Sequence, residues 1–297
     1  MKQYTVSIVI LTKNNQGTID ACLRGVFSQK LGGFEVVVID SGSTDDTLKI
    51  VEKYPVRLIQ IDSGEFRHGK TRNFAVKKAN GKFVVFIVAD AIPSSPDWLE
   101  LLLGPLVDNR EIAGVYGRQI VKKANPIQRF ALSWNYRETM KEKKTDTTIK
   151  NVFFSNVNSA FRKEVLLRYP FDEQLQMAED LELSKRLLEK GHGLVYAPRA
   201  SVYHCHDYTL SQVFRRYFEI GRAYTFIWFR EKKTNPGIQK EGFSFVYHEF
   251  SYLSRHSLFI WIPYSIFYNL SKLLGFLFGR YSELLPSTLL DKISLYR

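Results

Sequence analysis

Polar side chains that follow short apolar runs are the first candidates for chemistry in this chain. Four runs rich in β-branched residues end in a polar residue, at 6–12 (Thr12), 34–40 (Asp40), 56–62 (Asp62) and 82–90 (Asp90). Helical patterns separate the runs, so we expect parallel strands whose carboxyl ends meet at one edge of a sheet. Open α/β sheets bind ligands beyond that edge. A carboxylate at a strand end, Asp40 above all, is suited to accept hydrogen bonds from a base or a ribose.

The turn that follows Asp40 allows two interpretations. Ser41-Gly42-Ser43-Thr44 leads into a helical pattern that begins with Asp45 and Asp46. Hydroxyl caps and acidic first-turn residues stabilise a helix start without any ligand. The same polar groups are also placed to contact a nucleoside, and the sequence leaves both interpretations open for Asp45 and Asp46.

Basic side chains lie in the stretch GEFRHGKTRNFAVKKANGK (64–82). A planar guanidinium clamps phosphate oxygens, so Arg72, together with Lys70, is suited to hold a diphosphate. The alternative is the basic start of a surface helix.

Two further candidates are a pair of acidic residues and a pair of histidines. Glu179 and Asp180 open an expected helix at 179–189, where carboxylates also favour the positive helix end. His204 and His206 are two apart at the end of an expected strand, so they share a face. Three adjacent residues, His204-Cys205-His206, cannot close a tetrahedral zinc site, and no C-x-x-C occurs elsewhere in the sequence.

Composition narrows the class of protein. The chain of 297 residues is 45% apolar and 24% charged, which is typical of a globular protein. A net charge of +12 favours a partner rich in phosphate: nucleic acid, a nucleotide or an anionic membrane. No G-x-G-x-x-G or P-loop pattern follows a strand, which argues against a dehydrogenase or an NTPase. Two cysteines and an N-terminal apolar run too short for a signal peptide indicate a reducing cytoplasm.

The alternation of strands and helices indicates two regions. Further helices are expected at 19–29, 45–54 and 98–106, and further strands at 112–120, 152–162 and 193–204. After His206 the alternation gives way to helical patterns dense in aromatic residues. We therefore expect an α/β domain at 1–205, with a mainly parallel Rossmann-like sheet and flanking helices, and a helical C-terminal region at 206–297.

Residues 5–225 resemble the inverting family 2 glycosyltransferases of the GT-A fold, and most closely their bacterial rhamnosyltransferase-like branch. The resemblance rests on SIVILTKNNQGT, VVVIDSGSTDDT, GEFRHGKTRN and YHCHDYTLSQVFRRYFEIG. It implies that Asp40 contacts the nucleoside of the donor and that the backbone around Thr12 lies against the base. It also implies that Arg72 holds the donor and that Asp180 is the general base. We expect Glu179, Lys70 and Asn73 to support these residues.

The resemblance also implies a divalent metal ion, Mg²⁺ or Mn²⁺. FIVADAIPSSPDWLE takes the place of the family's acidic metal motif, and Asp90 is its expected ligand and donor contact. The usual pair of aspartates becomes Val88-Ala89-Asp90, so the first acidic residue is missing. The family places a metal-binding histidine after the last strand, and the sequence leaves this role to His206 or His204.

The expected activity is transfer of a deoxyhexose, L-rhamnose from thymidine diphosphate rhamnose, to a lipid-linked or polysaccharide acceptor. The alternatives are an enzyme that uses a uridine diphosphate hexose and, because of Val88, a catalytically silent binding module. A nucleic-acid partner is not expected, because the basic excess is dispersed and no recognition motif accompanies it.

The segment 257–280 is broadly apolar. Ser265, Asn269, Lys272 and Gly275 or Gly279 form one polar stripe at helical spacing. Such a helix is typical of the membrane interface, so we expect a peripheral protein on the inner face of the cell membrane. A helix buried against the catalytic domain, or a homo-oligomer contact, is the alternative.

Overall fold

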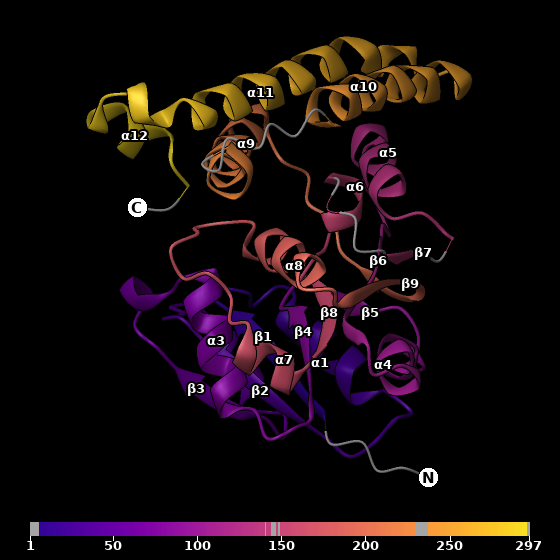
Figure 1. Ribbon diagram of the computed structural model, residues 1–297, viewed down its shortest axis with the longest axis vertical. Coiled ribbons are helices and arrows are strands. Elements are labelled where there is room, and N and C mark those ends of the chain that lie inside the picture. The colour runs from indigo at the N-terminus through magenta and orange to yellow at the C-terminus, as the bar shows by residue number, and fades with distance from the viewer. Residues whose placement is uncertain (1–5, 140, 144–146, 148, 230–236, 296–297) are drawn as a thin grey trace. The chain divides into compact units, whose positions relative to one another are not determined.

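The computed structural model describes residues 6–139, 141–143, 147, 149–229 and 237–295 (Figure 1). It divides into two compact units. The first unit comprises the described residues up to Lys122, Tyr136–Gln174 and Glu179–His204, and the second comprises Lys123–Asn135, Leu175–Ala178 and Cys205 onward. The boundary between His204 and Cys205 lies one residue before the division at 205/206 that the sequence suggests. Two short segments from earlier in the chain, Lys123–Asn135 and Leu175–Ala178, also belong to the second unit. The outer limits expected at residues 1 and 297 lie outside the described residues.

Four parallel strands form the first half of the sheet. They are β1 (Val6–Thr12), β2 (Phe34–Asp40), β3 (Arg57–Gln60) and β4 (Phe83–Val88), in the order β3-β2-β1-β4 (Figure 1). Side chains of β1, β2 and β4 are buried on both sheet faces, which explains why these runs are continuously apolar. The expected parallel α/β arrangement is confirmed here, although β3 is shorter than the run at 56–62.

The second half of the sheet is mixed. It continues from β4 in the order β8-β6-β9-β5, and β7 pairs with β9. Only β6 and β9 pair in parallel among these, and the other pairings are antiparallel. The bounds are β5 (Ile92–Pro93), β6 (Ile112–Ile120), β7 (Lys141–Lys143), β8 (Asn158–Arg162) and β9 (Gly193–Tyr203).

The prediction of a strand at 152–162 is wrong for the first half of that range. A helical turn, α6 (Ile149–Val152), ends where the strand was expected to begin, and β8 starts only at Asn158. The apolar residues between them face the core from outside the sheet: Phe154, for example, packs on Tyr116 and Phe161. Apolar residues alone do not distinguish a strand from a buried loop.

Helices of the first unit cover the sheet. Among the described residues they are α1 (Ile19–Phe27), α2 (Thr47–Val51), α3 (His68–Lys78), α4 (Trp98–Asp108), α6, α7 (Lys163–Arg168) and α8 (Glu179–Glu189), with a 3₁₀ turn at Ser63–Glu65. The buried residues of α1 and α4 join those of the strands in one apolar core. Side chains beyond the strand ends are therefore held by elements that cannot shift independently.

One buried polar contact ties α4 to the mixed half of the sheet. The Trp98 indole N–H donates to the side-chain oxygen of Asn158 at 2.9 Å, and the Asn158 amide donates to the Ala200 carbonyl at 2.8 Å. Trp98 and Asn158 are both fully buried. A tryptophan N–H in a core needs such a partner.

The second unit is helical in its described residues. It contains α5 (Pro126–Asn135), α9 (Leu210–Tyr224), α10 (Gly237–Arg255), α11 (Ile262–Arg280) and α12 (Ser287–Ile293), a π-helical turn (Thr225–Phe229) and 3₁₀ turns at Phe259–Trp261 and Ser282–Leu284. Thr209 caps α9 with a reciprocal bond pair to Gln212. None of the helices in the described part is both long and apolar enough to cross a membrane.

Replacing Trp98 by phenylalanine should lower the free energy of unfolding by about 1–3 kcal/mol, because the Asn158 oxygen loses its buried donor. Urea denaturation of the purified chain measures this. Leu167→Ala serves as the control, since the Leu167 side chain is 53% exposed. A Trp98→Phe variant as stable as the control would contradict the role of this contact.

Candidate functional site

The carboxyl ends of β1 and β2 meet as the sequence predicts. Thr12 and Asp40 are register partners in the last position of the two strands, and the Ser41 N–H donates to the Thr12 carbonyl at 3.0 Å. The loops beyond them are cross-linked, because the Asn14 N–H donates to the Ser43 hydroxyl and the Thr44 N–H donates to the Asn14 side chain. Asn14 has a φ of 53°, a backbone conformation that asparagine tolerates better than most residues.

Asp40 is buried and organises the turn that follows it. One carboxylate oxygen accepts the N–H groups of Gly42 and Ser43, each at 3.0 Å, and the other accepts the Ser43 hydroxyl. Gly42 has a φ of 81°, which suits glycine. Asp40 therefore shapes the rim of the site as well as lining it.

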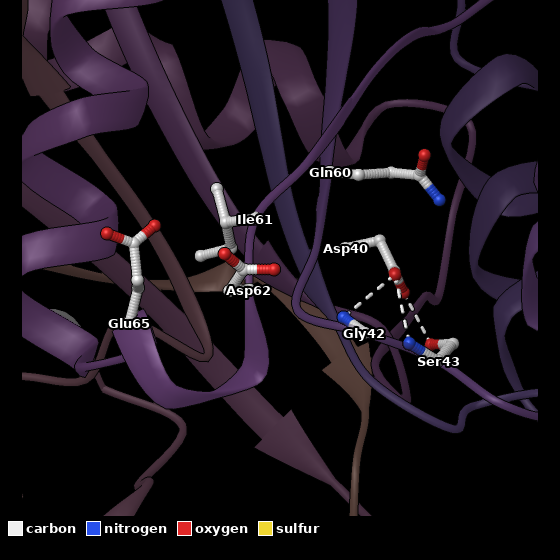
Figure 2. A pocket seen from close by; sticks show the side chains of 7 residues that line it. All are labelled: Asp40, Gly42, Ser43, Gln60, Ile61, Asp62 and Glu65. Carbon is white, nitrogen blue, oxygen red and sulfur yellow. Dashed lines mark hydrogen bonds between the residues drawn. The ribbon is translucent and has the colours of Figure 1, made fainter.

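A pocket of about 410 Å³ opens beside this turn. Figure 2 shows its lining from β2, β3 and the following turns: Asp40, Gly42, Ser43, Gln60, Ile61, Asp62 and Glu65. Three of these side chains are carboxylic acids. Ionised carboxylates only accept hydrogen bonds, so the pocket suits a ligand that offers hydroxyl or ring N–H groups better than one that offers phosphate.

A buried ion pair joins α3 to the start of α8. The Arg72 guanidinium lies 2.6 Å from the Glu179 carboxylate, with side-chain exposures of 6% and 5%. Arg72 also lies over the Phe86 ring, 5.7 Å from its centroid. Its Nε–H is buried and meets no hydrogen-bond acceptor among the described residues. The ion pair shows that Arg72 is not part of a solvated helix start.

The pKa values of the two acidic residues at the start of α8 are shifted in opposite directions. Burial raises the pKa of Glu179, but the Arg72 charge, together with smaller contributions from nearby positive charge and hydrogen bonds, outweighs burial and lowers that pKa below its usual range. For Asp180, burial and then the negative charge of Glu179 raise the pKa to about 6. Asp180 also accepts the Asn156 N–H at 3.0 Å, which fixes one carboxylate oxygen. The surroundings thus favour the charged form of Glu179, whereas they bring the pKa of Asp180 closer to neutrality than is usual for an aspartate.

Asp90 and His204 meet at another part of the sheet edge. The His204 Nε2 atom lies 3.5 Å from an Asp90 carboxylate oxygen, and His206 follows two residues later in the chain. Asp90 and His204 both belong to the first unit, whereas His206 belongs to the second. Asp90 and His204 are therefore a candidate pair of metal ligands within one unit, and the role of His206 stays a prediction from the sequence.

Gln119 on β6 orients His204. Its side-chain N–H₂ donates to the Tyr136 and Ser155 hydroxyls, so its carbonyl oxygen faces the His204 Nδ1 at 2.8 Å. An acceptor at Nδ1 requires the proton there, which leaves the Nε2 lone pair directed at the Asp90 carboxylate. A proton on Nε2 or a metal cation satisfies this pair, and a carboxylate with imidazole nitrogens is a donor set that suits Mn²⁺ better than Mg²⁺.

Besides Glu179, the two other supporting residues, Lys70 and Asn73, differ in their surroundings. Lys70 is exposed, with its ammonium 3.8 Å from the Glu65 carboxylate. Asn73 is buried and exchanges hydrogen bonds with the Phe171 backbone while its amide also donates to Glu173 at 2.9 Å. Asn73 therefore holds the segment that follows α7 against α3.

Comparison with known proteins decides the family. The model of Glycosyl transferase family 2 matches residues 7–169, more than half of the chain. The chain belongs to glycosyltransferase family 2. The matched residues include Thr12, Asp40, Arg72 and Asp90, whereas Asp180, His204 and His206 lie beyond the matched range.

Two curated relatives in this family match nearly the whole chain. The O-antigen chain rhamnosyltransferase WbaN of Salmonella anatum is 36% identical over 89% of this chain and 85% of its own length. The O-antigen chain rhamnosyltransferase RfbN of Salmonella typhimurium is 32% identical over 98% of this chain and 95% of its own. The expected resemblance to the rhamnosyltransferase branch is thus confirmed, and the chain is an enzyme of a glycosyltransferase family.

Solved structures confirm the GT-A fold. The mannosyltransferase PcManGT from Pyrobaculum calidifontis, in complex with GDP-Man and Mn²⁺, aligns with a TM-score of 0.66 at 19% identity, over 98% of this chain and 89% of that one. TarS 1-349 of S. aureus, in complex with UDP-GlcNAc, aligns with a TM-score of 0.56 at 17% identity, over 99% and 93% of the two chains. At such identities the likeness concerns the fold alone.

Sequence reasoning missed Gln119 and the Asn14 cross-link. Gln119 lies in an apolar strand and carries no motif, so its role becomes visible only when β6 and β9 pair. Asn14 offered a weak signal, since asparagine is common in left-handed turns.

Arg72→Met should lower the free energy of unfolding by about 3–5 kcal/mol at pH 7, because it leaves the Glu179 charge buried without its partner. The double variant Arg72→Met/Glu179→Gln should recover much of this loss, since no buried charge remains. Urea denaturation of both variants is the measurement. Equal stability of the single and double variants would show that the pair contributes no such coupling.

Proposed function

We propose that this enzyme is an inverting rhamnosyltransferase. It transfers L-rhamnose from thymidine diphosphate rhamnose to a lipid-linked or polysaccharide acceptor. The observation that carries the proposal is the near full-length similarity to two proteins named O-antigen chain rhamnosyltransferases. The arrangement around Asp180, Asp40 and Arg72 supports it chemically.

Asp180 is the proposed general base. An acceptor hydroxyl oxygen attacks the anomeric carbon of the donor, and the bond from that carbon to the diphosphate oxygen breaks. Asp180 takes the hydroxyl proton, while the nucleoside diphosphate leaves with the bonding electron pair. A base with a pKa of about 6 is ionised at neutral pH and still strong enough to hold the proton that it accepts. The fixed contact with the Asn156 N–H orients its carboxylate.

The donor's nucleoside is proposed to occupy the pocket beside Asp40. The carboxylates there accept hydrogen bonds from sugar hydroxyls and from the base, and the Thr12 backbone lies next to Asp40 on the neighbouring strand. Arg72 is proposed to face the diphosphate with its remaining buried Nε–H, which has no acceptor among the described residues. Lys70 adds positive charge, and Asn73 acts indirectly through the segment that it holds.

A divalent cation is the proposed cofactor, and Mn²⁺ fits the donor set best. Asp90 with His204 or His206 would hold it. When bound, such an ion neutralises the charge that develops on the leaving diphosphate. The protein's own contribution is to keep the His204 ring in one tautomer through Gln119.

We also propose that the enzyme is peripheral on the inner face of the cell membrane. Its proposed acceptor is membrane-linked. The chain carries a net charge of +12, which favours an anionic surface.

Incubation with separate sugar nucleotides tests the donor. Thymidine diphosphate rhamnose should raise the melting temperature and release thymidine diphosphate faster than uridine diphosphate hexoses release uridine diphosphate. Asp180→Asn should show the same rise in melting temperature with the donor, but its turnover should fall by about 10²- to 10⁴-fold. Preference for a uridine diphosphate hexose, or near-normal turnover in Asp180→Asn, would refute the donor or the base respectively.

The acid limb of kcat should lie near pH 6, because the rate requires ionised Asp180. Glu179→Gln should move this limb to lower pH, since removal of the neighbouring negative charge favours the ionised form of Asp180 while Arg72 stays positive. A pH–rate profile measures the shift. Glu189→Gln, at the exposed far end of the same helix, should leave the profile unchanged. A limb that stays in place in Glu179→Gln would contradict the coupling.

Gln119→Leu should weaken Mn²⁺ binding by about 10- to 100-fold, because His204 loses the acceptor that fixes its tautomer. Electron paramagnetic resonance titration of free Mn²⁺, with thymidine diphosphate present, measures this without turnover. Gln119→Glu retains an acceptor and should restore much of the affinity. Gln128→Leu, in the second unit, is the control, and unchanged Mn²⁺ affinity in Gln119→Leu would reject the role of Gln119.

A further inference from the structure

Helix α11 exposes apolar side chains and buries its small and polar ones. Of its nineteen residues, those with exposed side chains are all apolar: Pro263, Ile266, Phe267, Leu270, Leu273, Leu274, Leu277 and Phe278. Its buried residues are Ser265, Tyr268, Gly275 and Gly279. Apart from Pro263, the exposed side chains are 37% to 59% accessible. A surface helix of a water-soluble protein normally shows the opposite pattern.

The buried side of α11 is fixed by close packing within the second unit. A Cβ atom at Gly275 or Gly279 would overlap the carbonyl oxygens of Phe214 and Phe218 on α9. Any side chain larger than hydrogen is therefore excluded at these two positions. The helix cannot turn its apolar side inward without breaking this contact.

The polar side chains of α11 already have partners inside the same unit. The Asn269 amide lies 2.5 Å from the Glu249 carboxylate on α10 and also donates to the Ser265 carbonyl at 3.0 Å. The Lys272 ammonium lies 4.5 Å from the Phe245 ring centroid and 4.8 Å from that of Tyr268. These contacts stabilise the orientation in which the polar side of α11 faces the rest of the second unit and its apolar side faces outward.

The apolar surface continues beyond both ends of the helix. Phe259 and Ile260 before it are 60% and 86% exposed, and Tyr281 and Leu284 after it are 50% and 81% exposed. Contiguous apolar surface of this length is costly in water. We call the exposed apolar side chains of residues 259–284 the outer face of α11.

The charged residues from Phe250 to Ser282 have one sign, whereas the exposed Glu283 lies beyond the end of the helix. No acidic residue occurs between Glu249 and Glu283, whereas Arg255, Lys272 and Arg280 are basic. Basic residues near an anionic leaflet contribute to binding, and apolar side chains gain by entering the acyl region. A second copy of the chain would bring a further set of basic residues to the same surface.

We propose that the outer face of α11 inserts into the interfacial region of an anionic bilayer. Since no described helix is suited to cross a membrane, α11 lies in the plane of the surface. The inference gives the proposed peripheral location a specific contact surface, and it rests on the proposed function only for the choice of the inner leaflet. The second unit would hold the enzyme at the surface where a lipid-linked acceptor is found.

Flotation of the full-length protein with vesicles tests the proposal. Vesicles of phosphatidylglycerol and phosphatidylcholine should bind the wild type, and added salt or pure phosphatidylcholine should weaken binding. The variant Phe267→Ser/Leu270→Ser/Leu274→Ser should reduce the partition coefficient by at least about tenfold, because three apolar side chains no longer enter the lipid. Leu167→Ser, an equally exposed leucine on α7 of the first unit, should bind as the wild type does.

Two further measurements separate the possible failures. Circular dichroism and nucleoside diphosphate release should be unchanged in the triple variant, so loss of flotation with both retained supports the surface. Absence of flotation by the wild type, or equal flotation of wild type and triple variant, would overturn the proposal. A wild-type dimer in sedimentation that the triple variant abolishes would assign the face to a second copy instead. A wild type that floats but releases no nucleoside diphosphate would refute the proposed function alone.

Discussion

The buried ion pair between Arg72 and Glu179 is the interaction on which the candidate active site most depends. It connects α3 to the first residue of α8 across 107 residues of sequence. Two charges removed from water are stable only together, so the pair resists any movement of one helix relative to the other. Asp180 follows Glu179 directly, so the pair fixes the residue beside it, and the Glu179 charge adds to burial in raising the pKa of Asp180.

The same pair explains why two adjacent acidic residues differ in behaviour. Glu179 has its own cation, whereas Asp180 has only N–H donors and lies beside the Glu179 charge. An acidic pair at a helix start would by itself lower both pKa values through the helix dipole. Burial reverses this effect for Asp180 alone, and the difference between the two environments separates the fixed charge from the titrating one.

The sequence predicted those parts of the fold in which local pattern and burial agree. Continuous apolar runs gave the parallel strands, and the parallel register placed Thr12 beside Asp40 as expected. It could not give the bond between Gln119 and His204, because that contact depends on how β6 and β9 pair. It also placed the start of β8 too early, since Phe154 is apolar in a loop that packs against the core without entering the sheet. Val88 ends β4 as an apolar residue packed against the core, which is compatible with its strand but offers no ligand atom. The carboxylate of Asp90, two residues later, is the one that lies 3.5 Å from the His204 Nε2 atom.

Helix α11 shows a different limit of sequence reasoning. Its spacing predicts two faces, one small and polar and one apolar, but it does not say which face meets the protein. The decision comes from backbone contact: Gly275 and Gly279 allow α9 to approach more closely than any leucine would. Close approach brings van der Waals contact along both helices, and Asn269 gains Glu249 as its partner on the same side. Burial of the polar stripe therefore leaves the apolar residues outward as a geometric consequence. The proposed membrane contact rests on these outward apolar residues, and the absence of acidic residues from Phe250 to Ser282 favours an anionic surface for that contact.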